Sequence, residues 1–167
     1  MRKHLVYILP SLLISLFIYL FYRTEKTVVN DLFINIISRE NYILLKHFVL
    51  QKIPLNEYII FSLPEGLWVF CITLTSKDIY LTYKGKEIDF AFLPLVFSIG
   101  LELLQLLNFT NGRFDPFDIL ISIFFWFIAY FIIDHKFSKQ DIFKSFNNRS
   151  IAFLLSYAIV YLAHVWQ

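Results

Sequence analysis

Charged residues are scarce in this sequence. Asp, Glu, Lys and Arg make up 17% of its 167 residues, whereas hydrophobic residues make up 58% and aromatic residues 20%. A soluble domain typically contains about 25% charged and about 45–50% apolar residues. A folded chain of this length has a large surface to cover with polar groups, and this sequence lacks the charges to cover it in water. We therefore expect lipid as the solvent and a single membrane domain over residues 1–167.

Cysteine and the common catalytic motifs are also lacking. The single cysteine, Cys71, lies in an apolar run and is expected to be a small buried hydrophobic residue. One cysteine excludes a disulfide within the chain and a cysteine-based metal site. The histidines are dispersed and do not make a ligand set: His4, His47, His135 and His164. No Gly-rich phosphate loop, Gly-x-Ser-x-Gly or His-Glu-x-x-His motif occurs, so we expect no metal and no cofactor.

The basic residues do not gather in one stretch of the chain. The net charge is +2, and Lys and Arg are spread along the expected loops. A nucleic-acid-binding surface needs a basic face or stripe. The sequence therefore predicts no nucleic-acid partner.

Five apolar runs predict an all-α integral membrane helical bundle with about five transmembrane helices. The runs cover residues 5–22, 56–76, 90–109, 116–133 and 151–165. The first run follows a basic N-terminus, as in a signal peptide, but no small-x-small cleavage site follows it. We therefore expect it to be a retained anchor.

The remaining segments are predicted to lie at the membrane surface. Residues 23–55 mix apolar and polar positions, which favours one or two amphipathic helices in the interface. Lys84-Gly85-Lys86-Glu87 is expected to be a polar turn, and residues 134–149 a polar connection. The second run is interrupted at Ser62-Leu63-Pro64-Glu65-Gly66, so its main helix is expected to start at Ser62 and to continue towards Tyr83, after a separate lead-in.

The distribution of Lys and Arg predicts an orientation. With five spans, nine basic residues fall on the side of the N-terminus and six on the other side. The bias places the N-terminus inside and the C-terminus outside. It also places the loop from Arg113 to Asp118 on the outer face.

The first polar cluster lies inside the third run. Ser98, Glu102 and Gln105 are spaced i, i+4 and i+7, which places them on one face of a helix. An acidic residue at the centre of a membrane helix costs about 2.5–3.5 kcal/mol, so such residues are functional candidates. A polar seam that joins helices by hydrogen bonds explains the same pattern. For Glu102, the functional interpretation is favoured.

The second polar cluster opens the fourth run. Asp115 suits an N-cap, Pro116 suits the first helical position, and Asp118 suits the first turn, so capping alone accounts for both aspartates. The functional alternative is that Asp118 and Ser122 share a helix face. Arg113 would then pair with a carboxylate or bind a phosphate or carboxylate ligand.

The third candidate is Glu65, at the break in the second run. Ser62 and Glu65 have the spacing of a capping box. Alternatively, Glu65 faces Glu102 across the bundle, because two carboxylates in one apolar site are typical of acid/base or proton-coupled chemistry.

The third and fourth runs and the loop between them resemble the VanZ-like family of small bacterial membrane proteins. The resemblance covers about residues 90–133 and rests on Glu102-x-x-Gln105, followed by Arg113-Phe-Asp115-Pro-Phe-Asp118. Members usually follow the second aspartate with Asn and then small residues that allow close helix packing. This chain instead has Ser122 and then Phe124-Phe125-Trp126, which puts any activity that needs the Asn in doubt.

The resemblance implies a protein of the bacterial inner membrane that acts in cell-envelope processes. We expect a polar pocket near the outer leaflet that binds membrane lipid, a lipid-linked envelope precursor or another anionic envelope ligand. Arg113 would hold the anion, and Gln105 would orient the acidic groups. Hydrogen bonds or acid/base groups would come from Glu65, Glu102 and Asp118.

Two alternatives stay open at this point. The chain could be a structural or accessory subunit that docks a membrane protein partner through its aromatic surfaces. It could also be a membrane enzyme acting on a lipid, with the same three carboxylates as catalytic candidates. Against an enzyme, neither Ser98 nor Ser122 has a histidine beside it in the sequence. A proton-coupled transporter is less favoured, because the five runs show no inverted repeat.

Overall fold

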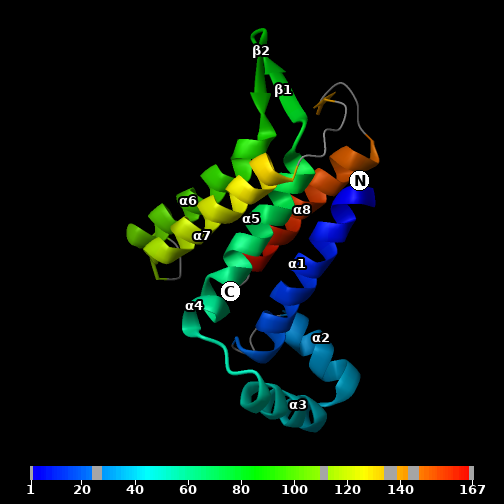
Figure 1. Cartoon of the computed structure of the whole chain (residues 1–167), viewed down its shortest axis with the longest axis vertical. Helices are drawn as coiled ribbons and strands as arrows, with labels where there is room; N and C mark the ends of the chain where they lie inside the picture. Colours follow the sequence, from blue (N-terminus) through cyan, green and yellow to red (C-terminus); the bar gives the residue numbers. More distant parts are fainter. Residues whose placement is uncertain (1, 24–27, 110–112, 134–138, 143–146, 166–167) are drawn as a thin grey trace.

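The computed structural model describes residues 2–23, 28–109, 113–133, 139–142 and 147–165. Most of this part of the chain is helical (Figure 1). The elements, in chain order, are α1 (Arg2–Phe21), α2 (Val28–Ile37), α3 (Arg39–Lys52), α4 (Glu57–Phe61), α5 (Leu63–Ser76), β1 (Ile79–Tyr83), β2 (Lys86–Asp89), η1 (Phe90–Phe92), α6 (Leu93–Leu106), α7 (Pro116–Phe127), η2 (Ile128–Ile132), β3 (Gln140–Asp141) and α8 (Asn148–Val165).

Helix α5 is the centre of the bundle. It packs most extensively against α7 on one side and α1 on the other, and it also contacts α6 and α8 (Figure 1). Ten of its 14 residues are buried. Cys71 belongs to the buried core of α5, together with Phe70 and Leu74, and packs near Ala129 of η2. The prediction of a buried Cys71 is therefore confirmed.

Gly66 allows α5 and α7 to approach each other closely. A Cβ atom at this position would lie 2.4 Å from Cδ2 of Phe125. Large aromatic residues on α7 are accommodated because α5 has no side chain at that point.

The break in the second apolar run is confirmed, but the end of that run was predicted wrongly. A short helix, α4, leads into α5 at Ser62, whereas α5 stops at Ser76 instead of continuing towards Tyr83. Lys77 follows the end of α5, and its ammonium group donates to the carbonyl oxygens of Tyr130 and Ile133, at 2.9 and 2.7 Å. These carbonyls lie at the C-terminal end of η2, so Lys77 satisfies the end of that helix and ties it to the end of α5.

The expectation of an all-α chain is wrong in one region, because a three-stranded sheet follows α5. Strand β1 pairs antiparallel with β2 and parallel with β3. Lys84 and Gly85 form the tight turn of the hairpin, both with positive φ (50° and 76°). Two-residue turns of this kind match the twist of the strands, and the residues of β1 are β-branched, aromatic or Leu. The turn was expected, but the strands on either side of it were missed.

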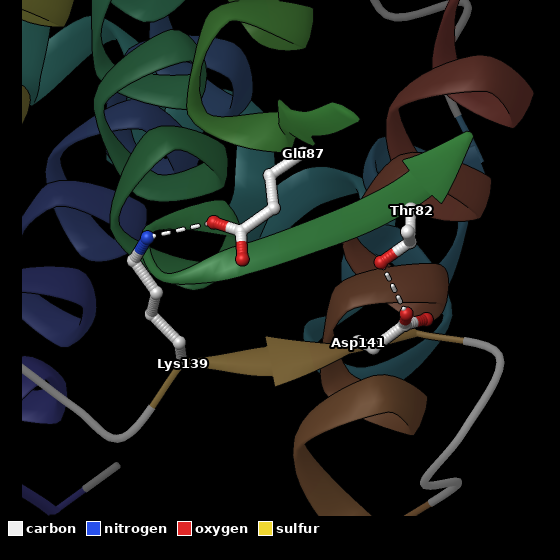
Figure 2. Close-up of polar contacts among 4 residues, drawn as sticks. All are labelled: Thr82, Glu87, Lys139 and Asp141. Carbon is white, nitrogen blue, oxygen red and sulfur yellow. Dashed lines mark hydrogen bonds and ion pairs between the residues drawn. The ribbon is translucent and has the colours of Figure 1, made fainter. Parts of the chain in front are cut away.

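Side chains tie the short strand β3 to the hairpin. The Thr82 hydroxyl donates to Oδ2 of Asp141 at 2.8 Å, and Nζ of Lys139 lies 2.8 Å from Oε2 of Glu87 (Figure 2). Lys139 and Asp141 lie in the predicted polar connection, Glu87 lies in the predicted turn, and Thr82 lies in the stretch expected to continue the helix. The sheet therefore joins segments that the sequence leaves unrelated.

Helices α2 and α3 confirm that the segment after α1 is largely helical. They lie beyond the end of α1, away from the sheet (Figure 1). The buried Tyr42 of α3 donates from its hydroxyl to the carbonyl oxygen of Leu20, at 2.7 Å. This contact holds α3 against the end of α1. The location of the two helices in a membrane interface stays a prediction.

Five helical segments coincide with the five apolar runs. Among the described residues, two of these five segments are long and apolar enough to cross a membrane, judged by length and composition. These two are His4–Phe21 and Glu57–Ser76, while Phe90–Leu106 and Pro116–Ile132 are shorter apolar helices. Large apolar side chains are nevertheless exposed on several helices, including Val6 on α1 at 69% and Leu120 on α7 at 63%. Exposed apolar surface of this extent indicates a contact with lipid or with another protein.

Candidate functional site

Polar residues from three helices meet beside the start of α5. The carboxylate cluster, as we call it, comprises Glu65 of α5, Ser98 and Glu102 of α6, and Asp118 and Ser122 of α7. Ser98 and Ser122 are fully buried, and Glu102 is 4% exposed. All five were sequence candidates. The structure brings them together because α6 and α7 are adjacent and both contact α5.

Ser98 links the three helices by hydrogen bonds. Its hydroxyl lies 2.9 Å from Oγ of Ser122 and 3.2 Å from Oε1 of Glu65. The other Glu65 oxygen accepts from the indole N–H of Trp68, at 2.6 Å. Trp68 was not a candidate, although its i, i+3 spacing from Glu65 could have indicated this contact.

The predicted capping box does not form. Ser62 occupies the N-cap position of α5, but it has helical backbone angles and its side chain makes no capping bond. Glu65 therefore does not act as the acidic member of a capping box at the start of α5. It points instead to Ser98 and Trp68, which is the functional alternative left open by the sequence.

Glu102 faces the interior of the bundle. Its Oε2 accepts a hydrogen bond from the backbone N–H of Asp115, at 3.1 Å. The Glu102 carboxylate also lies within electrostatic range of Glu65 and Asp118. Glu65 and Asp118 are in range of each other as well. The two glutamates thus share one site, as the functional hypothesis for Glu65 requires, without a direct hydrogen bond.

The two aspartates at the start of α7 differ in what they do. Asp115 is the N-cap, since its Oδ1 accepts from the backbone N–H of Phe117 at 2.9 Å. Its structural interpretation is confirmed. Asp118 lies in the first turn, but its Oδ1 is buried and has no hydrogen-bond partner within the described residues. Buried polar atoms are nearly always satisfied, so Asp118 calls for a further explanation.

Ser62 is the second polar group without a partner. It is 1% exposed, it neighbours the Asp118 carboxylate, and its Oγ makes no hydrogen bond of acceptable geometry to any described residue. Leaving such a group unpaired costs about 1–3 kcal/mol. The two groups lie side by side, so the Ser62 hydroxyl is itself the nearest donor for the Asp118 carboxylate, and water or a ligand is the other partner that these atoms could take.

The other two sequence candidates lie outside the cluster. Gln105 is half-buried, and its side chain forms no hydrogen bond with the described part of the chain. Arg113 is exposed and makes no ion pair with any residue in the ranges described. The expected pairing of Arg113 with Glu102, Asp115 or Asp118 is not observed among the described residues.

Arg23 is the basic residue that the structure places near the carboxylates, and the sequence analysis did not single it out. It follows the end of α1 and donates from Nη2 to the carbonyl of Phe61 at 2.6 Å, and from Nε to that of Ile60 at 3.3 Å. Its guanidinium lies 4.6 Å from the centre of the Tyr19 ring. It is also within electrostatic range of Asp118. A lone arginine after an apolar run is a weak signal, because such residues usually mark the membrane boundary.

The cluster can accept hydrogen bonds and hold or release protons, but its composition does not suit several other chemistries. No group of three His, Cys, Asp or Glu side chains in the described ranges could hold a metal ion. Ser98 and Ser122 bond to each other, and the buried His4 contacts the carbonyl oxygen of Leu74. A serine nucleophile activated by histidine is therefore not supported.

Comparison of the chain with protein families, with curated protein sequences and with solved structures finds no match.

Proposed function

We propose that this chain is a multi-pass protein of the bacterial inner membrane, of the VanZ-like type, that binds the polar head group of a lipid-linked or anionic envelope ligand. The ligand would sit against the carboxylate cluster. We place the cluster near the outer leaflet, with the N-terminus and the sheet inside and the C-terminus outside. All five apolar segments would then span or enter the bilayer.

The observation that carries this proposal is the pair of unsatisfied buried groups at the cluster. Ser62 Oγ can donate one hydrogen bond, and Asp118 Oδ1 can accept. Both atoms lie where α4 ends, α5 starts and α7 starts. A head group with hydroxyl or charged substituents would satisfy both atoms. Irregular backbone such as the α4–α5 junction is tolerated at membrane depth when it lines such a site.

The membrane location is supported by where apolar side chains are exposed. Only 22% of the apolar window of α1 is buried inside the protein. Further exposed apolar residues lie on α6, α7 and α8, including Val96, Phe124 and Leu155. In water these surfaces would promote aggregation, whereas in lipid they need no cover.

The proposal predicts a ligand that is lost when Glu102 is neutralised. The protein would be purified in mild detergent from its native membrane, as wild type and as Glu102→Gln, and bound lipid and protein would be identified by mass spectrometry. We expect a lipid-linked or anionic molecule in the wild type and at least a tenfold reduction in the variant, about the loss of one charge-assisted hydrogen bond. Gln keeps an oxygen that can accept from the Asp115 N–H, so the fold should be retained.

A matched control tests whether the loss is specific. Glu40→Gln makes the same change on an exposed residue of α3 and should leave the bound molecule unchanged. Equal retention of all lipids in wild type and Glu102→Gln would contradict the proposal. A stoichiometric protein partner retained in both would favour the accessory-subunit alternative, which the same exposed apolar surfaces support.

A further inference from the structure

The apolar segment formed by α4 and α5 is interrupted next to a proline. The segment is long enough to cross a membrane, but the structure divides it into two helices with Ser62 between them. Proline has no N–H to donate, and its ring pushes against the carbonyl four residues earlier, which for Pro64 is that of Ile60. The Phe61 carbonyl belongs to the last residue of α4 and lies at the same interruption. Two consecutive backbone carbonyls therefore need donors from outside their own helix.

Arg23 donates to both of these carbonyls. Its Nη2 lies 2.6 Å from the carbonyl oxygen of Phe61, and its Nε lies 3.3 Å from that of Ile60. The planar guanidinium holds its donors at a fixed separation, so one side chain can serve two neighbouring acceptors. The centres of the Tyr19 and Phe61 rings lie 4.6 and 5.5 Å from the guanidinium carbon. These rings restrict the guanidinium to the orientation that the two hydrogen bonds need.

Helix α3 holds the part of the chain that carries Arg23. The backbone carbonyl of Arg23 accepts from Nζ of Lys46 at 3.4 Å, and the Tyr42 hydroxyl donates to the carbonyl of Leu20 at 2.7 Å. The end of α1 is thus bonded to α3 on one side and, through the guanidinium, to the α4–α5 interruption on the other. The position of Arg23 is set by contacts independent of the carboxylate cluster.

The interruption is also where the carboxylate cluster begins. Ser62 lies at the interruption and neighbours the Asp118 carboxylate, and Glu65 follows in the first turn of α5 and accepts from Ser98 at 3.2 Å. In a bilayer, unsatisfied backbone carbonyls are costly, so a break in a spanning helix persists where another group satisfies them. The placement of Ser62 and Glu65 therefore depends on the group that satisfies these carbonyls.

We infer that Arg23 is a positioning residue for the carboxylate cluster: it supplies the hydrogen bonds that the interruption at Pro64 requires, and so fixes Ser62 and Glu65 at the start of α5. This inference rests on the proposed function, which gives the cluster its role, and it assigns Arg23 no contact with the ligand. An arginine that only marks the membrane boundary needs its charge alone. A positioning arginine needs the charge and both donors, so lysine does not replace it.

Hydrogen–deuterium exchange of the detergent-solubilised protein tests whether Arg23 holds the interruption. Methionine keeps much of the length of the side chain and removes every donor. We expect the amides around the interruption to exchange about tenfold faster in Arg23→Met, with α7 unchanged, and Arg23→Lys to lie between the two. Arg39→Met, at an exposed arginine of α3, is the matched control and should change nothing. Wild-type exchange in Arg23→Met, or in Arg23→Lys, would overturn the inference.

A second substitution tests whether Arg23 acts through the released carbonyls. Pro64→Ala restores an N–H that can reach the Ile60 carbonyl. We therefore expect Pro64→Ala to raise the thermal unfolding temperature more in Arg23→Met than in the wild type, where Arg23 already satisfies this carbonyl. An equal shift in both backgrounds would show that the two positions do not interact and would overturn the inference. If Arg23→Met does not fold, Arg23→Lys with and without Pro64→Ala measures the same interaction.

The molecule that co-purifies with the protein separates a positioning role from a purely structural one. Its retention should fall about tenfold in Arg23→Met under conditions where circular dichroism shows the variant folded. Faster exchange with unchanged retention of a molecule that depends on Glu102 would overturn the positioning role and leave the proposed function in place. Absence of any bound molecule from the wild type would contradict the proposed function, whereas the exchange and Pro64→Ala results would still decide whether Arg23 holds the interruption.

Discussion

Charged side chains near the two ends of α5 have opposite surroundings. At its C-terminal end, the sheet pairs unlike charges in water, as in Lys139 and Glu87, whose side chains are 68% and 53% exposed. At its N-terminal end, three carboxylates gather in an apolar surrounding, and one of them, Glu102, is almost completely buried. Exposed pairs contribute little to stability, whereas buried charges are costly and persist where other contacts or a function maintain them. This difference is why we place the candidate functional site at the second end and expect the first end to be structural.

The largest loss of stability is expected from adding a side-chain atom between α5 and α7. Gly66→Ala places a Cβ atom 2.4 Å from the Phe125 ring, so the two helices must separate or the ring must move. We expect a loss of about 1–3 kcal/mol in the free energy of unfolding, the usual cost of overpacking. Thermal unfolding of detergent-solubilised protein would measure it.

A second glycine provides the control for this change. A Cβ atom at Gly100 of α6 meets no atom within 4 Å, so Gly100→Ala should be neutral or slightly stabilising. Phe125→Leu should partly rescue Gly66→Ala. If Gly66→Ala unfolds at the wild-type temperature, the close approach of α5 and α7 does not govern the geometry of the cluster.

A smaller effect is expected from removing the hydroxyl that joins the cluster. Ser98→Ala leaves Ser122 and one Glu65 oxygen without this partner, while Glu65 keeps its bond to Trp68, so we expect a loss of about 0.5–1.5 kcal/mol in the free energy of unfolding. The double variant Ser98→Ala/Ser122→Ala should lose less than the sum of the single variants, because both partners of one bond are then apolar. Full additivity in the unfolding free energies would show that the two hydroxyls do not interact.

The smallest effect is expected at the sheet. Lys139→Ala removes an exposed ion pair and should not shift the unfolding temperature measurably. The Glu87 carboxylate beside Lys139 raises the pKa of that ammonium. The small contribution is therefore complete below the unfolded pKa of lysine and is lost only as pH rises through the raised folded pKa. A stability difference between Lys139→Ala and wild type that varied between pH 6 and 8 would contradict this account.

Local sequence signals predicted the pieces of the site well. The i, i+4 spacing of Ser98 and Glu102 placed both on one helix face, and that face is buried. The Asp115-Pro116 pair predicted a helix start, and the cap is formed as expected. Both succeed because they depend on one helix and its immediate neighbours in the chain.

Contacts between distant segments were predicted poorly. The sheet joins strands more than 50 residues apart, and the hairpin signal alone was too short to indicate it. Arg23 and Arg113 look equivalent as loop arginines, yet one lies beside the carboxylates and the other is exposed. Spacing along the chain therefore identified the acidic residues of the cluster but not the arginine that lies nearest to them in electrostatic terms.

The sequence by itself determined that apolar helices dominate this protein, where most of them begin, and which acidic residues lie on inward faces. Each of these properties follows from hydrophobic period and capping chemistry within a single element. Only the tertiary structure decided that Glu65, Glu102 and Asp118 gather in one cluster, that Gly66 lets α7 approach, and that Arg23 binds the backbone carbonyls at the α4–α5 junction. Such choices depend on how helices pack against one another, where the shape of one residue on a facing helix outweighs any local preference.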